Sequence, residues 1–182
     1  DYLVPAYSTI PSSKMDRKTI LEQIGIVLLS EAPISERLLQ KRITKIFGLT
    51  RLANKNKEEY DLAIEEALKT YPTTRNKDLT LFFWNIDADP KRLSFYRKRS
   101  GNSERAINDI AKEEIAVAIY DVLMDQFGLD KEGLARQLLS YFSMSRATGK
   151  YKDIIDEAID WAIGNRTDFL TTGENGALLL KS

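Results

Sequence analysis

The sequence contains FGLTRLANKNKEEYDLAIEEAL at Phe47–Leu68 and FSMSRATGKYKDIIDEAIDWAI at Phe142–Ile163. The two stretches align without a gap at an offset of 95 residues and share eight identical positions. When the alignment is extended to Ile20–Leu68 and Ile115–Ile163, 13 of 49 positions are identical. A repeat at a fixed offset indicates two copies of one structural unit.

The first copy has the pattern of three helices. Asp16 is a helix-capping residue before residues 17–31, where apolar side chains recur with helical spacing. Ser35 is the capping residue of a second predicted helix at residues 36–47, and Gly48 predicts the end of that helix. Residues 57–71 form the third predicted helix, which ends at a proline.

A different pattern follows the third helix. In LTLFFW, residues 79–84, the apolar side chains Leu79, Leu81 and Phe83 occupy alternate positions, which predicts a strand of a short hairpin. In the second copy, the predicted helices are residues 113–127, 131–142 and 151–163, with Asp130 as a cap, and residues 168–180 predict a second hairpin about a Gly/Asn turn.

Three helices followed by a hairpin are typical of a winged helix, an elaborated helix-turn-helix. We therefore expect a mainly α fold with small β hairpins, arranged as a tandem winged-helix repeat. The expected organisation is an extended N-terminal arm at residues 1–14, winged-helix units at 15–85 and 103–182, and a basic linker at 86–102.

The composition argues against several classes of function. The 182 residues include no His and no Cys, which excludes the usual zinc sites, thiol chemistry and Ser-His-Asp arrangements. No catalytic residue, metal site or cofactor is expected. No apolar run is long enough to span a bilayer, and no signal peptide is visible, so we expect a cytoplasmic protein without membrane contact. Because the chain begins at Asp1 and ends abruptly, we expect it to be a piece of a longer intracellular protein.

The predicted third helices carry many acids, including Glu58, Asp61 and Glu65 in the first copy and Asp153 and Asp160 in the second. These acids disfavour insertion of either helix into a DNA groove, because like charges repel the phosphates. The net charge of the chain is zero, so nucleic acid would have to bind at local basic patches. The residues that we expect to contact a nucleic-acid backbone are Lys41, Arg42, Lys45, Arg51, Lys55, Lys57, Arg75, Lys77, Arg97, Lys98, Arg99, Arg146, Lys150, Lys152 and Arg166.

Two structural interpretations stand beside this one. The repeated arginines Arg51 and Arg146 are equally suited to bonding helix carbonyls or pairing with Asp61 and Asp156. In the linker, Phe95 and Tyr96 stand among basic residues. This composition is typical of segments that bind single-stranded nucleic acid, and it is also compatible with a solvated linker that two aromatic side chains anchor.

The sequence also resembles an uncharacterised domain near the C-terminus of very large bacterial proteins related to superfamily I helicases. The residues that carry this resemblance, over roughly Ile20–Ala162, are Ala32, Pro33, Ile34, Phe47, Gly48, Arg51, Phe83, Trp84, Glu113, Glu114, Ile115, Ala118, Ile119, Phe142, Arg146 and Gly149. The resemblance implies a parent protein with helicase and nuclease-like parts, whose ATPase motifs lie outside this chain.

The sequence therefore predicts a non-catalytic accessory module of a helicase-like protein, which engages the backbone of DNA or RNA without reading its sequence. The alternative is a protein-docking module that binds the rest of the parent chain, or another partner, through the acidic faces of the third helices.

Overall fold

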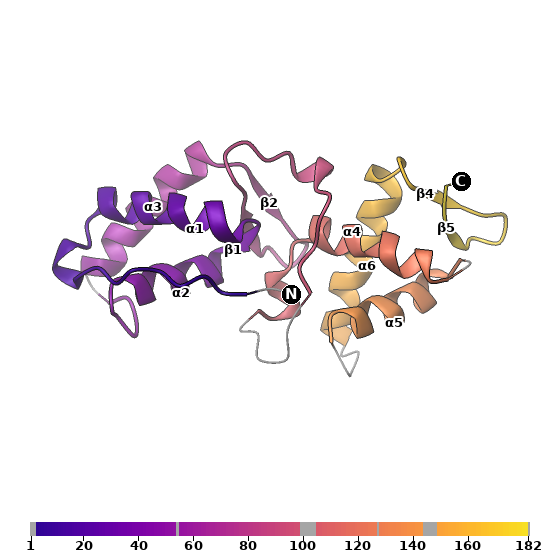
Figure 1. Ribbon diagram of the computed structural model, residues 1–182, viewed down its shortest axis with the longest axis horizontal. Helices are drawn as coiled ribbons and strands as arrows, with labels where there is room; N and C mark the ends of the chain where they lie inside the picture. The colour runs from indigo at the N-terminus through magenta and orange to yellow at the C-terminus, as the bar shows by residue number, and fades with distance from the viewer. Residues whose placement is uncertain (1–2, 54, 99–104, 127, 144–148, 182) are drawn as a thin grey trace. The chain divides into compact units, whose positions relative to one another are not determined.

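The computed structural model describes residues 3–53, 55–98, 105–126, 128–143 and 149–181. The chain divides into two compact units. Val4–Thr74 and Leu81–Ala88 form the first, which we call the N-terminal unit. Asp1–Leu3, Arg75–Thr80 and Asp89–Ser182 form the second, the C-terminal unit. The described residues are mainly helical with two small antiparallel sheets, as the sequence predicts (Figure 1).

In the N-terminal unit, the short 3-10 helix η1 spans Ser12–Lys14, and the α-helices are α1 at Arg17–Glu31, α2 at Glu36–Ile46 and α3 at Lys55–Thr70. The strands are β1 at Ile34–Ser35, β2 at Thr73–Arg75 and β3 at Leu81–Phe83, and the last residue of β2, Arg75, is counted in the C-terminal unit. In the C-terminal unit, η2 spans Pro90–Arg92 and η3 spans Ile107–Asp109. The α-helices there are α4 at Lys112–Met124, α5 at Lys131–Tyr141 and α6 at Gly149–Asn165, and the strands are β4 at Leu170–Thr172 and β5 at Leu178–Leu180.

The predicted helix caps are confirmed. Asp16 accepts a hydrogen bond from the Thr19 N–H at 2.8 Å, and Ser35 accepts one from the Leu38 N–H at 3.3 Å. Asp130 accepts one from the Gly133 N–H at 2.6 Å. Each bond satisfies a backbone donor that a helix leaves without an internal partner. These local bonds explain why the starts of α1, α2 and α5 were predictable from sequence.

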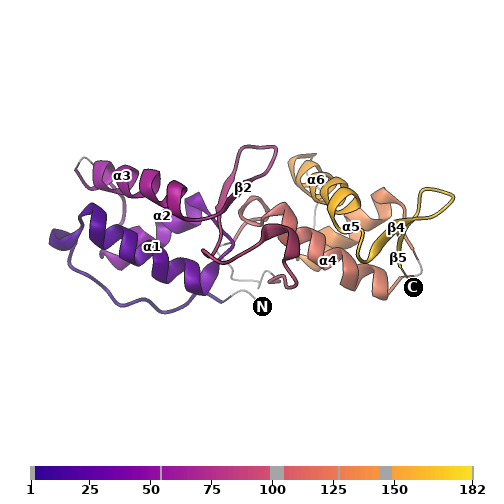
Figure 2. The ribbon, with the colours of Figure 1, turned by 90° about the horizontal axis from the view of Figure 1, so that it is seen from above.

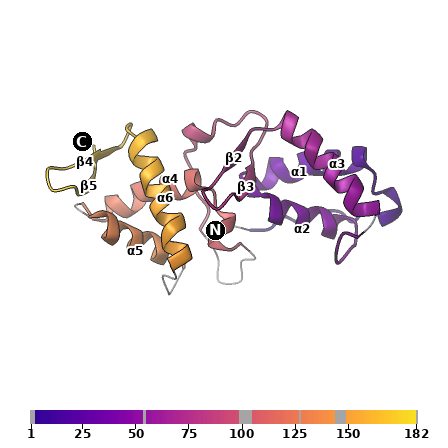
Figure 3. The same ribbon diagram turned by 180° about the vertical axis from the view of Figure 1, so that it is seen from behind.

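Each unit has its own apolar core. In the N-terminal unit α3 lies along α1 (Figure 2), and the buried side chains of α1, α2 and α3 meet those of Leu81 and Phe83 from β3. In the C-terminal unit α6 lies across α4 and α5 (Figure 3), and all three helices bury apolar side chains together with Leu170 and Leu178 from the hairpin. Burial of these side chains is the main force that holds each unit together.

The two units follow the same plan in strand register as well as in helices. Helices α2 and α5 begin 95 residues apart and end 95 residues apart. In the N-terminal unit, Ile34 of β1 pairs with Phe83 of β3, and in the C-terminal unit an isolated bridge joins Leu129 to Leu178. Both residues of the second pair lie 95 positions after those of the first. The bridge therefore keeps the 95-residue offset of the helices, whereas β4 and β5 begin 97 residues after β2 and β3.

The expected alternation in LTLFFW is wrong. Leu81, Phe82, Phe83 and Trp84 are all buried, so both faces of β3 are covered. Leu79 lies in the preceding turn with a φ of 67° and is 74% exposed. The alternation rule assumes one solvated face, and the burial of Phe82 as well as of Leu81 and Phe83 shows that this strand lacks one.

Tyr60 of α3 has the one described side chain with a buried polar atom and no hydrogen-bond partner. Burial, and then the carboxylates of Glu36 and Asp61, raise the pKa of this phenol. A buried hydroxyl without a partner has lost its water without compensation. We expect Tyr60→Phe to raise the free energy of unfolding of the N-terminal unit by about 1 kcal/mol.

Urea denaturation followed by fluorescence measures this change. The chain has two tryptophans, Trp84 in the N-terminal unit and Trp161 in the C-terminal unit, so a Trp161→Phe background reports the N-terminal unit alone. A clear loss of stability in the Tyr60→Phe protein would mean that the hydroxyl makes a favourable interaction.

Candidate nucleic-acid interface

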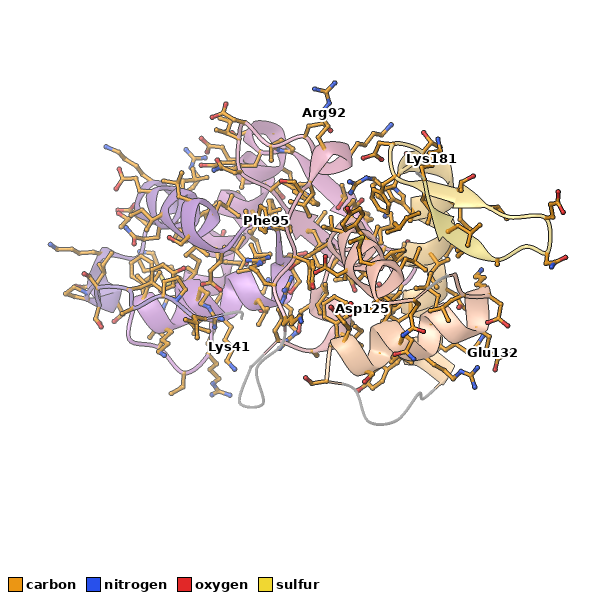
Figure 4. All side chains as sticks on the ribbon, turned by 45° about the vertical axis from the view of Figure 1, so that its right-hand side comes forward. Lys41, Arg92, Phe95, Asp125, Glu132 and Lys181 are labelled. Atoms are coloured by element: carbon orange, nitrogen blue, oxygen red, sulfur yellow. The ribbon has the colours of Figure 1, made fainter. Side chains whose placement is uncertain are left out.

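Helix α2 presents a basic stripe on one side of the N-terminal unit. Arg37, Lys41 and Lys45 follow one another at intervals of four residues and are exposed, and Figure 4 shows Lys41 on the outer surface. The opposite side of α2 buries Leu38, Leu39, Ile43 and Ile46. Helical spacing therefore separates a core face from a cationic face on the same helix.

The stripe forms one wall of a groove of about 650 Å³. The chain turns at Gly48, whose φ is 66°, and the Leu49 N–H donates to the Thr44 carbonyl at 2.9 Å. This turn places the α2–α3 segment, with Arg51, beside α2 and the start of α3. The groove is lined by Arg37, Gln40, Lys41, Thr44, Lys45, Leu49, Thr50, Arg51, Leu52 and Lys57. Five of these are cationic and none is a carboxylate.

The exposed side of α3 has the opposite charge. Glu58, Asp61, Glu65 and Glu66 are exposed, while Tyr60, Ala63, Ile64 and Ala67 face the core. Glu59 is half-buried and accepts a hydrogen bond from the Arg17 N–H at 2.9 Å. Lys57 pairs with Asp61 one turn later, so its charge is partly balanced. Lys55, at the start of α3, is exposed. The positive charge of this unit thus gathers at α2 and the segment after it.

Arg42 does not line this groove, although the sequence analysis expects it to contact a nucleic-acid backbone. It is 1% exposed, and its Nε donates to the two carboxylate oxygens of Glu31 at 2.9 and 3.2 Å. Tyr7 from the N-terminal arm donates its hydroxyl to the same carboxylate at 2.6 Å. Arg42 therefore has a structural partner in the interior, and we remove it from the set of residues that face a nucleic acid.

The turn residues Arg75 and Lys77 belong to the C-terminal unit and are exposed. Arg75 donates to the Leu79 carbonyl within its own turn at 3.2 Å, and the Lys77 N–H donates to Glu157 of α6 at 2.8 Å. The Asn76 side chain between them is buried and bonds the backbone of Ile110 and Lys112. These bonds hold the turn, and the Arg75 guanidinium itself makes one of them.

The other predicted cations of the C-terminal unit are mostly engaged. Arg97 is half-buried beside Glu114, and Arg166 is paired with Asp168. Lys98 is exposed, with Nζ 4.2 Å from the centre of the Tyr141 ring. The Lys152 side chain bonds Asp156 at 3.0 Å, and this bond raises the pKa of Lys152. Arg99, Arg146 and the Lys150 side chain lie outside the described residues.

The C-terminal unit does not repeat the basic stripe of α2. The positions on α5 that match Arg37, Lys41 and Lys45 at the 95-residue offset are Glu132, Arg136 and Ser140. All three are exposed, and Figure 4 shows Glu132 on the outer surface of its unit. The two copies thus share a core pattern and differ in the charge on the exposed side of their second helix.

Arg37 was not among the residues that the sequence analysis expected to contact a nucleic-acid backbone. The signal was present, since Arg37, Lys41 and Lys45 have the spacing that places side chains on one helical face. The same spacing places Arg42 between Leu38 and Ile46 on the core face, so the inward direction of Arg42 was also readable.

Within the described residues, no group of three or more His, Cys, Asp or Glu side chains is arranged to hold a metal ion. A search of the same residues finds no helix with the length and apolar character needed to cross a membrane.

In comparisons with protein-family models, curated proteins and solved structures, this chain has no significant match.

Proposed function

We propose that this chain is a non-catalytic tandem winged-helix module of a cytoplasmic helicase-like protein, and that it holds a nucleic-acid backbone without reading base sequence. The observation that carries the proposal is the α2 groove, in which five cationic side chains and no carboxylate line one surface of the N-terminal unit. Such a surface neutralises phosphates and contributes affinity that is indifferent to sequence.

The order of elements supports the winged-helix part of the proposal. Three helices precede a hairpin, and the short strand β1 between the first two helices pairs with the second strand of that hairpin. The second unit has three helices and a hairpin in the same order, with the bridge Leu129–Leu178 at the matching positions. This is the arrangement expected of a helix-turn-helix unit with a wing.

The mode of binding differs from groove reading by the third helix. The exposed acids of α3 repel phosphates on that side, whereas α2 and the segment after it attract them. We therefore place the phosphate backbone against α2, Lys45 and Arg51. The contact is electrostatic, so affinity falls steeply as salt concentration rises.

The paired substitution Lys45→Glu and Arg51→Glu tests this placement. We expect about a tenfold or larger loss of affinity for a short labelled DNA duplex at low salt, because two attractive charges become repulsive. The slope of affinity against salt should also fall by about one for each phosphate contact removed. Fluorescence anisotropy at several salt concentrations measures both quantities.

A matched control keeps the change in net charge. Lys18→Glu with Lys69→Glu alters two exposed lysines of the same unit that do not line the groove. This control should retain most of the affinity. Equal losses in both pairs would assign binding to overall charge, and an unmodified protein that binds neither duplex nor single strand at low salt would reject the proposal.

The acidic side of α3 supports a second candidate function, docking onto a basic surface of the parent protein. Glu58, Asp61, Glu65 and Glu66 are exposed together on this helix. Charge reversal at Glu65 and Glu66 should abolish capture of the helicase-like portion by this chain if docking occurs there. Unchanged capture would exclude this face.

A further inference from the structure

In residues 91–98 of the C-terminal unit, Leu93 is buried, Tyr96 and Arg97 are half-buried, and the other side chains are exposed. The Tyr96 hydroxyl donates to Asp121 of α4 at 2.5 Å, and its ring lies 6.1 Å from that of Phe142 in an edge-on arrangement. The Arg97 N–H donates to Glu114 at 2.8 Å. On either side of these two anchors, Phe95 is 50% exposed and Lys98 is exposed. The segment therefore presents an aromatic ring to solvent from a fixed backbone.

Phe95 lines a groove of about 600 Å³ together with Tyr120 of α4 and Phe169, which lies just before β4. Tyr120 of α4 is 42% exposed and meets the Phe169 ring edge-on, with the ring centres 5.5 Å apart. The Arg166 guanidinium lies 4.6 Å from the centre of the Phe169 ring. The groove is thus lined by the partly exposed side chains of Phe95 and Tyr120, and the Arg166 guanidinium lies beside the Phe169 ring.

A second groove, of about 510 Å³, adjoins the first and shares Ser94, Arg166 and Asp168 with it. Lys91 and Arg92 line the second groove and are exposed, with the Arg92 side chain at 88%. Cationic side chains therefore lie directly beside the aromatic surface, in one continuous lining.

The two acids in these linings already have partners. Asp121 accepts the Tyr96 hydroxyl, and Asp168 accepts two bonds from Arg166 at 3.2 and 3.3 Å. Against these two carboxylates, the joined linings hold four cations, Lys91, Arg92, Lys98 and Arg166. Cations therefore outnumber carboxylates in these linings, and Arg92 also pairs with Asp89 at 3.6 Å. The apolar part of the linings consists of aromatic rings together with Leu93 and Val117.

We propose that these adjoining grooves bind a single-stranded nucleic acid, with an unpaired base stacked on Phe95 and Tyr120 and the adjacent phosphates beside Lys91 and Arg92. This inference deepens the proposed function and rests on it. Interleaved aromatic and basic side chains suit single strands, because every base has a stacking face and every nucleotide a negative charge. A duplex keeps its bases paired and cannot supply the stacked one. The excess of cations over carboxylates in the linings favours a polyanion over an aromatic peptide.

The paired substitution Phe95→Ala and Tyr120→Ala tests the stacking contact in the full chain. We expect about a tenfold or larger loss of affinity for a labelled oligothymidylate, since stacking on an aromatic side chain is a major contribution per base. Affinity for a duplex should stay within about twofold, because phosphate contacts at the α2 groove remain. Met124→Ala, an exposed apolar residue of the same helix as Tyr120, is the matched control and should bind as the unmodified protein does.

An oligonucleotide with abasic sites provides an independent measurement. It keeps the phosphates and removes the bases, so it should bind the unmodified protein about as weakly as the oligothymidylate binds the paired variant. Circular dichroism checks that the variant is folded.

The outcomes separate this inference from the proposed function. If the paired variant binds single strands normally while Lys45→Glu with Arg51→Glu loses duplex binding, the stacking inference is wrong and the proposed function stands. If the unmodified protein binds no oligonucleotide at low salt, both are wrong. If the aromatic groove binds N-acetyltryptophanamide, through Phe95 and Tyr120, and single strands do not compete, the site belongs to a protein partner and the inference is overturned.

Discussion

Glu114→Gln is expected to lower the free energy of unfolding of the C-terminal unit by about 3–5 kcal/mol. The Glu114 side chain is fully buried and bonds two arginines. Arg105, which is 1% exposed, donates through both of its terminal nitrogens, one of them at 2.9 Å from Oε1. Arg97 donates through its backbone N–H at 2.8 Å and through its guanidinium at 3.2 Å.

The large effect follows from removing one member of a buried charge network. A neutral glutamine keeps the shape of the side chain but removes the negative charge that the buried Arg105 guanidinium meets at Glu114. Arg105 also donates to the carbonyls of Asp109 and Arg97, both at 3.3 Å, so the loss extends to the segment that leads into α4 and to residues 95–98. We therefore expect weaker single-strand binding along with the lower stability.

The same carboxylate predicts a dependence of stability on pH. Burial raises the pKa of Glu114, but the charges of Arg105 and Arg97 lower it by more, to about 2, from an ordinary value of 4.5. Because folding depresses this pKa, the carboxylate stabilises the folded state above about pH 4.5. Its contribution is lost as pH falls from 4.5 toward 2. The glutamine variant lacks this contribution and should have a flatter stability profile over that window.

Urea denaturation at neutral and acidic pH, followed by Trp161 fluorescence in a Trp84→Phe background, measures both effects. Glu132→Gln is the control, because Glu132 lies in the same unit and is exposed. We expect that control to change stability by less than about 0.5 kcal/mol. A Glu114→Gln protein as stable as the control would show that the network contributes nothing net.

Arg42→Gln should destabilise the N-terminal unit by about 3–5 kcal/mol. The change leaves the Glu31 carboxylate, 1% exposed, without its guanidinium partner and with the Tyr7 hydroxyl as a donor. A buried carboxylate that loses its counter-charge keeps its desolvation cost without the attraction that balanced it. Urea denaturation followed by Trp84 fluorescence in the Trp161→Phe background gives the size of the loss.

The internal repeat supplies a matched control for this pair. At the 95-residue offset, Glu31 corresponds to Gln126 and Arg42 to Gln137. The double substitution Glu31→Gln with Arg42→Gln therefore places the residues of the second copy in the first and removes both charges together. We expect the double variant to be more stable than Arg42→Gln alone, because no unpaired buried charge remains. Losses that simply add would mean that the two side chains do not interact.

The double variant also separates structure from binding. Since Arg42 points into the core, we expect a folded double variant to bind a duplex as tightly as the unmodified protein. A clear loss of affinity in this folded protein would restore Arg42 to the nucleic-acid interface.

Helix starts were predictable because their cause is local. Asp16, Ser35 and Asp130 each bond a backbone N–H three residues later, so a few neighbouring residues contain the whole interaction. Strand β1 could not be predicted in this way. Its two residues, Ile34 and Ser35, are a strand because they pair with Phe83 and Phe82, which lie nearly 50 positions later.

The candidate site likewise has one part that the local sequence predicts and one part that depends on tertiary contacts. The cationic character of residues 37–57 is visible in the composition of that segment, and helical spacing predicts which lysines of α2 share a face. The aromatic groove was less accessible, since Phe95, Tyr120 and Phe169 come from three distant segments. Its rings become neighbours through Tyr96 and Arg97, whose partners Asp121 and Glu114 lie on α4.

The repeat, the mainly helical fold and the acidic side of α3 follow from residues close together in the chain, where spacing and capping act over one or two turns. The direction of Arg42, the burial of both faces of β3 and the solvent exposure of Phe95 depend on contacts between distant segments. The position of a charged or aromatic residue in the sequence does not by itself tell which group its side chain contacts. Burial decides whether an arginine neutralises Glu31 inside the core or a phosphate outside it, because an uncompensated charge is costly only where water is excluded.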